Sequence, residues 1–378
     1  MSDQRHTPAD GRRAAHRSHD AQSGAEDAAG GAAGGAGAAD GGTGWWPRFK
    51  RSPFLPAAVL SLIIAAAAGL FAGSYTYAMA DPTPHRVPVA VVGYTDAHRD
   101  RADAFAKAVS EDLRSSLELH EYGTRAEAEE ALESQQVFAV LEIPSGAGRP
   151  PVLHVSSASG ASVAELLTQA ARTVGEETGL RVQVRDAKPL DPGDPRGLAL
   201  FYVSLAAVVT GFIGAIQMSV HARALNPPER IAFTAAYSLL GGFAIAAAVD
   251  WGLNAIDFPF VQSWLILALT MFSSGMVFTM FHTLIGRWAM LPTWGVMVLI
   301  GNPSSGGAVA WPLLPSPLGV VGRWLPPGAS VNAQHTAVYF PGHQHVQPYL
   351  VLAAWAVGSC TVFWIWRHRH PGGRTAGE

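Results

Sequence analysis

The sequence predicts a polytopic α-helical membrane protein, with six transmembrane helices and an α/β domain inserted outside the cytoplasm after the first helix. Charged residues make up 15% of the 378 residues and apolar residues 49%, whereas a soluble domain has about 25% charged residues. Six apolar runs in the chain approach or exceed the roughly 18 residues that a membrane-spanning helix needs. The segment between the first two runs is instead polar, with alternating strand and helix patterns.

The two ends of the chain lack the apolar content of a folded segment. Residues 1–44 are of low complexity and rich in glycine and alanine, which predicts a disordered cytoplasmic tail. Residues 371–378 are predicted to be a second, short cytoplasmic tail. The net charge is −3 and the basic residues form no continuous stripe, so the sequence offers no nucleic-acid surface.

Runs without charged residues mark the predicted spans. They cover residues 54–80, 197–220, 231–249, 258–281, 288–300 and 346–366, which gives a first helix within 53–80 and a five-helix domain within 196–370. The fifth run continues uncharged to Gly322, but the glycines, proline and serines between Gly301 and Gly307 break a helix. Irregular backbone in a membrane must be shielded by protein or water. We therefore expect a fifth helix that ends near this loop, and a short half-inserted segment after it.

Basic residues near the span ends predict the orientation. They are Arg48, Lys50, Arg51, Arg223, Arg230, Arg287, Arg367, Arg369 and Arg374. With six spans all of them fall on one side, which the positive-inside rule assigns to the cytoplasm. Both termini are then cytoplasmic, residues 81–195 are extracytoplasmic, and the protein lies in the plasma membrane.

The end of the first run has a second interpretation. Ala78-Met79-Ala80 resembles a signal-peptidase site after a hydrophobic run. The run is much longer than the core of a signal peptide and follows a long polar tail, so we favour a retained helix.

The segment 81–195 has the pattern of an independent α/β domain. Strands are predicted at 87–94, 117–122, 137–143, 152–155 and 180–185, and helices at 102–113, 124–134 and 163–174. The order of elements is therefore βαβαββαβ. The second helix begins with a capping box, because Thr124 is followed three positions later by Glu127. About 110 residues suffice to bury a core of their own.

Motifs of the common catalytic and nucleotide sites are missing from the sequence. It contains no Gly-Lys dipeptide and hence no Walker A loop, no Gly-x-Ser-x-Gly elbow and no His-Glu-x-x-His pair. His343 and His345 lie two positions apart, but no cysteine or carboxylate follows or precedes them closely, so we predict no metal there. No ionisable residue falls in the middle of a span, which argues against a proton-driven transporter. We expect no enzyme activity and no cofactor.

Several local motifs occur in an order typical of one class of exporter. They are Val89-Ala90-Val91-Val92, the segments Phe138 to Pro144 and Asp194 to Leu198, and the loops Gly301 to Gly307 and Leu325 to Gly328. With one span, a soluble domain and five further spans, they resemble the type-2 ABC exporter permeases and the related phage-infection-protein (Pip-type) membrane family. The resemblance covers roughly residues 53–370.

The resemblance implies two functional segments. The first is the loop motif near the fifth span, with Gly301, Pro303, Ser304, Gly306 and Gly307, for which a helix stop without a ligand role is the alternative. The second is a cytoplasmic loop on which a separate ATPase docks, with His221, Arg223, Asn226, Pro227, Glu229 and Arg230. The amphipathic helix that the family usually has before the first span is here reduced to Trp45-Trp46-Pro47-Arg48-Phe49-Lys50, whose aromatic residues suit a membrane interface.

Two functions are compatible with these observations. The resemblance implies the permease-like subunit of an ABC-type exporter that lacks its own ATPase domain and moves a lipid, a drug or a peptide. The alternative is a stand-alone envelope protein whose external domain binds cell-wall material, a secretion component or a phage. The expected partners are the lipid bilayer, a separate ATPase and, through small residues such as Gly241 and Gly242, a second copy of the chain.

Overall fold

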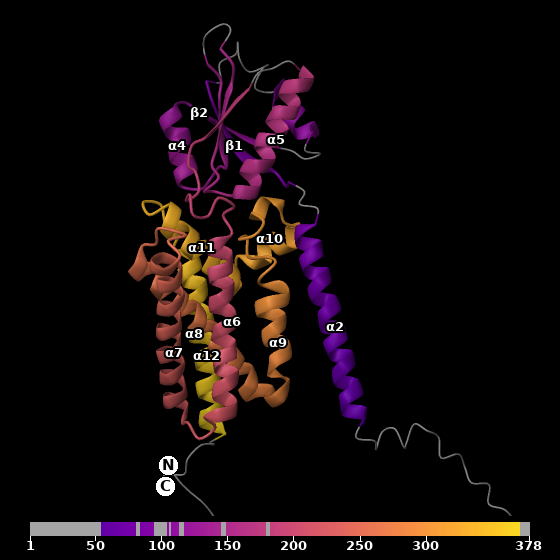
Figure 1. Ribbon diagram of the computed structural model, residues 1–378, viewed down its shortest axis with the longest axis vertical. Coiled ribbons are helices and arrows are strands. Elements are labelled where there is room, and N and C mark those ends of the chain that lie inside the picture. Colours follow the sequence, from indigo (N-terminus) through magenta and orange to yellow (C-terminus); the bar gives the residue numbers. More distant parts are fainter. Residues whose placement is uncertain are drawn as a thin grey trace, which may run out of the picture. The chain divides into compact units, whose positions relative to one another are not determined.

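The computed structural model describes residues 54–80, 84–93, 104–105, 107–112, 117–144, 149–178 and 182–370. The chain divides within its first helix, after Leu60, and the part that begins at Ser61 contains the sheet and the remaining helices. That part is mostly helical and carries a five-stranded mixed sheet between residues 87 and 186 (Figure 1). Both predicted tails, 1–44 and 371–378, lie outside the described residues.

The sheet orders its strands β2-β1-β3-β4-β5. The strands are β1 (Val87–Val92), β2 (Leu117–Tyr122), β3 (Ala139–Glu142), β4 (Val152–Val155) and β5 (Gln183–Asp186). β1 pairs in parallel with β2 and β3, β4 pairs in parallel with β5, and only the β3–β4 pairing is antiparallel among these. All five predicted strands are present; the last one is described from Gln183 to Asp186, and residues 180–181 of the predicted strand lie outside the described residues.

Two helices of the sheet domain are α4 (Arg125–Glu133) and α5 (Ala161–Thr178). The predicted capping box of α4 is confirmed, because Glu127 N donates to Thr124 Oγ1 and Thr124 N donates to Glu127 Oε2, each at 3.2 Å. Of the helix predicted at 102–113, residues 104–105 and 107–112 are helical, and residues 102–103, 106 and 113 lie outside the described residues. The order of elements in the described residues therefore agrees with βαβαββαβ.

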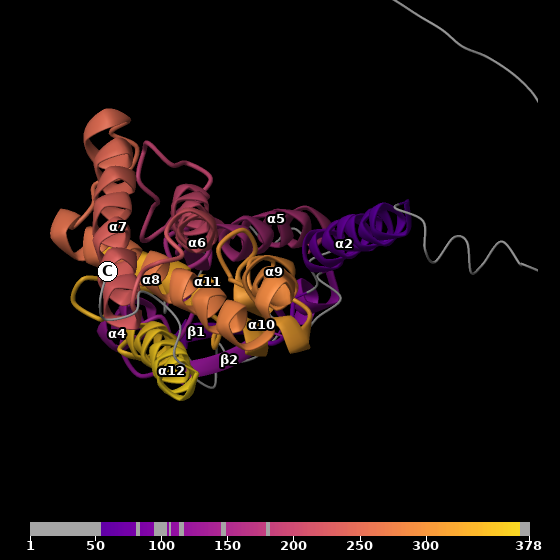
Figure 2. The same ribbon diagram turned by 90° about the horizontal axis from the view of Figure 1, so that it is seen from below.

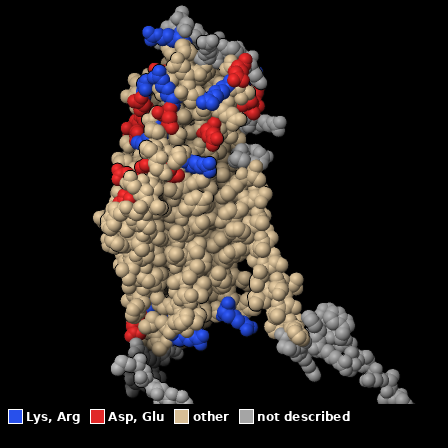
Figure 3. Space-filling view, viewed as in Figure 1, with Lys and Arg blue, Asp and Glu red and all other residues tan. Residues whose placement is uncertain are grey.

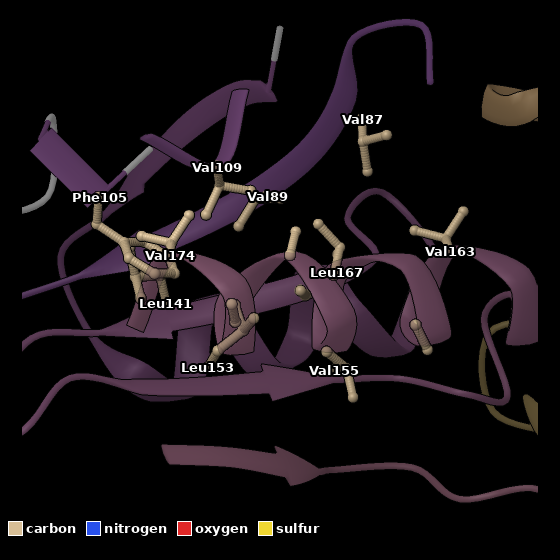
Figure 4. Packing of buried hydrophobic residues seen from close by; sticks show 14 of the residues in the cluster. Val87, Val89, Phe105, Val109, Leu141, Leu153, Val155, Val163, Leu167 and Val174 are labelled. Atoms are coloured by element: carbon tan, nitrogen blue, oxygen red, sulfur yellow. The ribbon is translucent and has the colours of Figure 1, made fainter. Parts of the chain in front are cut away.

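The side chains of β1 alternate between two hydrophobic clusters, one on each face of the sheet. Val87, Val89 and Val91 belong to the cluster that includes the inner face of α5 (Figure 4). Ala90 and Val92 belong to the cluster that includes α4. Because complete burial of a valine or leucine is worth about 1.5–3 kcal/mol, this alternation fixes which face each helix covers.

Within the described residues, five apolar helical stretches are long enough to cross a membrane, so the protein is a multi-pass membrane protein. They are α2 (Phe54–Met79), α6 (Ala199–His221), α7 (Pro227–Ala247) with η1 (Ala248–Gly252), the stretch Phe260–Ile300 that starts with α8 (Phe260–Ile285), and α12 (Gln347–Arg369). On the face drawn in Figure 3, charged side chains are scattered over the sheet domain, a few more lie at the opposite end, and the band between them is uncharged. This band is the surface that a bilayer would cover.

α8 lies at the centre of the helices and contacts α6, α7 and α12 (Figure 2). Glycines permit the close approach of the neighbouring backbones. A Cβ on Gly211 of α6 would lie 2.5 Å from the carbonyl oxygen of Met271, and one on Gly242 of α7 would lie 2.7 Å from Ala268 N. Gly241 also packs, against the Met271 side chain. Gly241 and Gly242, which were predicted as possible contacts with a second copy of the chain, therefore pack against α8 of the same chain.

The stretch Phe260–Ile300 is not one straight helix. Its 41 residues would extend roughly 60 Å, about twice the thickness of a bilayer core. α8 ends at Gly286, which has a φ of +61°. η2 (Gly286–Ala289), α9 (Met290–Trp294) and η3 (Gly295–Ile300) then run back toward the sheet domain (Figure 1).

A loop and three short helices follow Ile300: η4 (Trp311–Leu313), α10 (Ser316–Gly322) and α11 (Pro326–Tyr339). α11 is buried along most of its length and packs against α6, α8 and α12. Its polar side chains pair with α8, since Thr270 Oγ1 donates to Ser330 Oγ at 2.8 Å and Gln334 Nε2 donates to Ser263 O at 2.9 Å. α10 and α11 occupy the place of the short segment expected after the loop.

Candidate ligand cavity between the sheet domain and the helices

A cavity of about 1780 Å³ lies between the sheet domain and the membrane helices. The sheet domain contributes the segment before β1, residues 135–138 after α4, the ends of β4 and β5, and one side of α5. The remaining wall comes from the segment before α6 and its first turn, the residues 305–312, α10, α11 and the beginning of α12 with the loop before it. Sites for drug-sized molecules measure about 300–1,000 Å³, so this cavity has room for a larger molecule.

The first half of the predicted loop motif serves packing. Gly301 lies against Pro327 at the start of α11, where a Cβ would come within 2.8 Å of the proline ring. Ser304 donates its hydroxyl to Ile300 O at 2.6 Å, and Pro303 is buried beside it. These three predicted residues end the helical turn η3 and are not among the residues that line the cavity.

The second half of the motif lines the cavity. Gly306 has a φ of +80° and lies against Trp311, where a Cβ would come within 2.6 Å of the indole nitrogen. Gly307 lies between Phe201 of α6 and Val331 of α11, at 2.9 Å and 3.1 Å from where its Cβ would be. Any larger residue at these two positions would collide with the wall. The motif is thus partly a helix end and partly a cavity wall.

Residues 309–313 are built into the core of the sheet domain. Ala310 and Leu313 belong to the same hydrophobic cluster as β1 and α5. Ala310 N donates to Ser162 Oγ at 3.0 Å, and His85 N donates to Pro312 O at 2.8 Å. The loop of Gly306 and Gly307 lines the cavity, and the residues that follow it, 309–313, attach it to the sheet domain.

The loop before α12 makes a second contact with the sheet domain. His343 Nε2 lies 2.9 Å from Glu130 Oε1, and His345 Nε2 lies 3.3 Å from Ser134 O at the end of α4. Lys188 lies over the ring of Phe340, with its Nζ 4.6 Å from the ring centroid. No metal was predicted at these two histidines, and both of them connect the loop before α12 to α4.

Two aspartates form a third contact. Asp194 is buried, and its carboxylate accepts the N–H groups of Leu198 at 3.0 Å and Ala199 at 2.8 Å. Asp191 Oδ2 accepts the N–H of Asp257 at 3.1 Å. The carboxylate of Asp194 accepts hydrogen bonds from free amides and interacts favourably with the positive end of the α6 dipole. The motif Asp194 to Leu198 is therefore the start of this helix.

The cavity wall is more basic than acidic. Its charged residues are Arg86, Arg172, Arg196, Arg323, Glu165 and Asp186. Arg323 lies over the ring of Trp311 at 4.8 Å, and burial lowers the pKa of this guanidinium, which remains a cation at neutral pH. Phe201, Trp311 and Trp324 add apolar area to the same wall. The cavity therefore combines cationic and aromatic surfaces.

His335 of α11 also lines the cavity, at ring-centroid distances of 5.5 Å from Tyr339 and 5.7 Å from Phe340. Burial lowers the pKa of His335 to about 4, with a smaller effect in the same direction from His345 and an opposing one from a backbone hydrogen bond at Ala158. The imidazole is therefore neutral at neutral pH.

Neither Arg323 nor His335 was predicted from the sequence as a site residue. A signal for both was present, because Arg323 ends a long uncharged run and His335 lies in a buried helix that follows it. Ionisable residues next to long apolar runs are candidates for functional sites. Only the fold brings them to one wall with Arg172 of the sheet domain.

At the opposite end of the helices, the predicted docking loop is a tight connection between α6 and α7. α6 ends at His221 and α7 begins at Pro227, so residues 222–226 join them. The ring of His221 bonds within α6, with Nδ1 3.1 Å from Gln217 O.

The other predicted docking residues mostly bond within this connection. Asn226 N donates to Glu229 Oε2 at 2.9 Å, and Arg230 donates to Ala222 O at 3.3 Å. Arg223 is exposed. Arg223 and Arg230 also line a hollow of about 510 Å³ at this end.

In the part of the chain that the structure describes, no group of three or more His, Cys, Asp or Glu side chains is arranged to hold a metal ion. No protein-family model matches the chain, and no curated protein matches it. The resemblance to exporter permeases therefore rests on the motifs of the sequence alone.

Proposed function

We propose that this chain is the permease-like subunit of an ABC-type exporter, without an ATPase domain of its own, and that it moves an amphiphilic molecule. The cavity of about 1780 Å³ shared by the sheet domain and the helices carries this proposal. Its arginines suit an anionic head group, while Phe201, Trp311 and Trp324 suit an apolar body. The expected cargo is an anionic lipid, drug or peptide.

The proposed topology has six spans, with both termini in the cytoplasm and residues 81–195 outside it. The reversal at Gly286 supports two spans within Phe260–Ile300. With this count the basic residues Arg223, Arg230 and Arg287 gather at the end opposite the sheet domain, which fits the positive-inside rule for a plasma-membrane protein.

In this proposal the cavity is the substrate site on the extracytoplasmic side of the membrane. Gly306 and Gly307 belong to its wall, and Ala310 lies just beyond them in the core of the sheet domain. A shift of this loop relative to α6 and α11 would change the cavity and the sheet domain together. The loop motif is thus the proposed link between substrate binding and movement of the external domain.

The energy for export would come from a separate ATPase, because the sequence has no Walker A loop. The proposed docking surface is the connection from His221 to Arg230, where Arg223 is exposed. Two copies of the chain would complete a transport path in this arrangement.

One observation favours the alternative of a stand-alone envelope protein. Only residues 222–226 join α6 to α7, and Arg230 and Glu229 bond back to this connection. Little of it is left for contact with an ATPase. The cavity and the sheet domain would then bind a partner from outside the cell, such as cell-wall material, a secretion component or a phage.

Binding of a fluorescent anionic amphiphile to the purified full-length protein tests the cavity. Arg172→Gln and Arg323→Gln each remove a cation from its wall, and each should weaken binding about tenfold, which corresponds to about 1.4 kcal/mol. Arg185→Gln is the matched control, because Arg185 is exposed on β5 and does not line the cavity. Equal affinities for all three variants and the unsubstituted protein would rule out the cavity as the site.

Purification of the tagged protein from its native membrane separates the two functions. Recovery of an ATPase subunit, with ATP-dependent release of the amphiphile after co-reconstitution, is the result expected of an exporter. Export that persists when no ATPase is recovered, or amphiphile binding without any transport, would contradict ATPase coupling and favour the stand-alone protein.

A further inference from the structure

A second hollow, of about 510 Å³, lies at the end of the helices opposite the sheet domain. Its wall is made by the last turns of α6, α8 and α12 and the beginning of α7. Three arginines and two histidines line it: Arg223, Arg230, Arg367, His282 and His370. Among the described residues of this wall, none is acidic.

The basic groups of this hollow are close enough to interact electrostatically. Arg223, Arg230 and Arg367 are the permanent cations among them, and all three line the same space. Three like charges, from the connection between α6 and α7, from α7 and from α12, repel one another and favour a bound anion. The arrangement therefore creates a site with positive potential.

Two general effects account for basic residues at this end without any ligand. The positive-inside rule enriches arginine next to spans, and cations are favourable at the C-termini of helices such as α6, α8 and α12. Neither effect requires the side chains to surround one hollow. Arg287 shows the difference, because it lies at the same end, over the ring of Trp288 at 5.5 Å, and does not line the hollow.

The rim of the hollow is apolar and reaches the lipid-facing surface. Val220, Phe363 and Trp366 line it, and Val220 and Trp366 are exposed on the helix surface. Tryptophan at this depth is typical of the membrane interface. A molecule bound here would therefore place a charged group among the arginines and an apolar part along α6 and α12.

We infer that this hollow binds a phosphate group, and that the phosphate belongs to the head group of an anionic phospholipid in the adjacent leaflet. Arginine presents paired N–H donors that match phosphate oxygens. Basic pockets between transmembrane helices are known as a binding mode for such head groups. The inference uses only the position of the hollow, so it does not depend on the proposed transport function.

The test measures lipid retention by the full-length protein in detergent. After equilibration with phosphatidylglycerol or phosphatidylcholine, native mass spectrometry should show phosphatidylglycerol retained in preference. Arg223→Gln, an exposed residue whose loss should not affect folding, and Arg230→Gln should each reduce retention at least fivefold. Arg287→Gln, the matched control at the same end, should retain the lipid as the unsubstituted protein does.

A second arm identifies the source of the phosphate. Glycerol phosphate and inorganic phosphate are added at millimolar concentration, and thermal unfolding and lipid displacement are followed. If phosphatidylglycerol stabilises the protein and these ions do not displace it, the result supports a lipid as the source of the phosphate. Saturation by the soluble ions without lipid preference would overturn the lipid assignment, and equal retention by Arg223→Gln, Arg230→Gln and Arg287→Gln would overturn the site.

Discussion

The amide of Ala310 donates a hydrogen bond of 3.0 Å to the hydroxyl of Ser162. Ser162 lies at the start of α5 in the sheet domain, and Ala310 follows the loop motif beyond the helical turn η3. Ala310 is buried in the core of the sheet domain. This bond therefore joins the wall of the cavity to the domain outside the helices, across 148 positions of the sequence.

Removal of the Ser162 hydroxyl should destabilise this junction. In Ser162→Ala the buried N–H of Ala310 loses its acceptor, and an unsatisfied buried donor costs about 1–3 kcal/mol. We expect a lower thermal unfolding temperature of the purified protein. Thr173→Ala is the control on the same helix, since the Thr173 hydroxyl donates within α5 to Gln169 O at 3.2 Å. An equal decrease in both variants would contradict a special contribution of the junction.

The sequence predicted local elements well, because their determinants are local. The Thr124–Glu127 capping box and the alternating residues of β1 lie within a few positions of one another, and both predictions are confirmed. The helix-breaking loop was likewise predicted from Gly301 and its neighbours.

Contacts between distant segments could not be predicted in the same way. The antiparallel position of β4 in the sheet, the contacts of His343 and His345 with α4, and the gathering of Arg172, Arg323 and His335 around one cavity depend on the fold. Periodicity and turn chemistry carry information about faces and ends of elements, but not about which faces meet. The loop motif illustrates this limit, because its packed half and its cavity half are alike in composition.

The helix cap at Asp194 gives a second prediction. Asp194→Ala removes the acceptor of two N–H groups at the start of α6, and loss of such a cap typically costs about 1 kcal/mol. Asp194→Asn keeps one of the two oxygen acceptors and should recover part of the stability. Thermal unfolding of the three proteins checks the order, with the aspartate most stable and the alanine least. If asparagine were no better than alanine, the negative charge rather than the hydrogen bonds would be the main contribution.

Packing of α6 against α8 gives a third prediction. In Gly211→Ala the new methyl group would lie 2.5 Å from the Met271 carbonyl oxygen, so the helices must separate. Overpacking of this kind costs about 1–3 kcal/mol. Gly358→Ala is the matched control in α12, because a Cβ there meets nothing within 4 Å. Unfolding temperature and expression in the membrane should fall for Gly211→Ala and stay unchanged or rise for Gly358→Ala.

The buried histidine of the cavity predicts a dependence of stability on pH. The pKa of His335 is lowered from 6.5 to about 4 in the folded protein, so the unfolded chain takes up the proton more readily. The stability that the neutral ring contributes is fully present above about pH 6.5 and is lost as the pH falls through 4. Because the ring faces the cavity and is partly accessible, we expect a loss of about 1–2 kcal/mol rather than the full value for the shift.

Comparison with His335→Gln isolates this contribution, because other groups also titrate over the same range. The free energy of unfolding of both proteins is measured at pH 7 and at pH 4.5. The decrease on acidification should be smaller in His335→Gln by about 1 kcal/mol. An identical decrease in the two proteins would assign the acid sensitivity to other groups.

The reversal of the chain at Gly286 predicts which segments a reagent outside the cell can reach. Asp257 precedes α8 on the side of the sheet domain, where its N–H bonds to Asp191, and Arg287 follows α8 at the opposite end. Single cysteines are introduced at these two positions in a Cys360→Ala background, since Cys360 is the only native cysteine. With six spans and cytoplasmic termini, a membrane-impermeant thiol reagent should label Asp257→Cys in intact cells and Arg287→Cys only after permeabilisation.

Val346→Cys, at the start of α12, should then react from outside like Asp257→Cys, because η2, α9 and η3 have returned the chain to that side. Labelling of Val346→Cys only after permeabilisation would mean that the stretch Phe260–Ile300 crosses the membrane once and that the basic clusters are divided between the two sides.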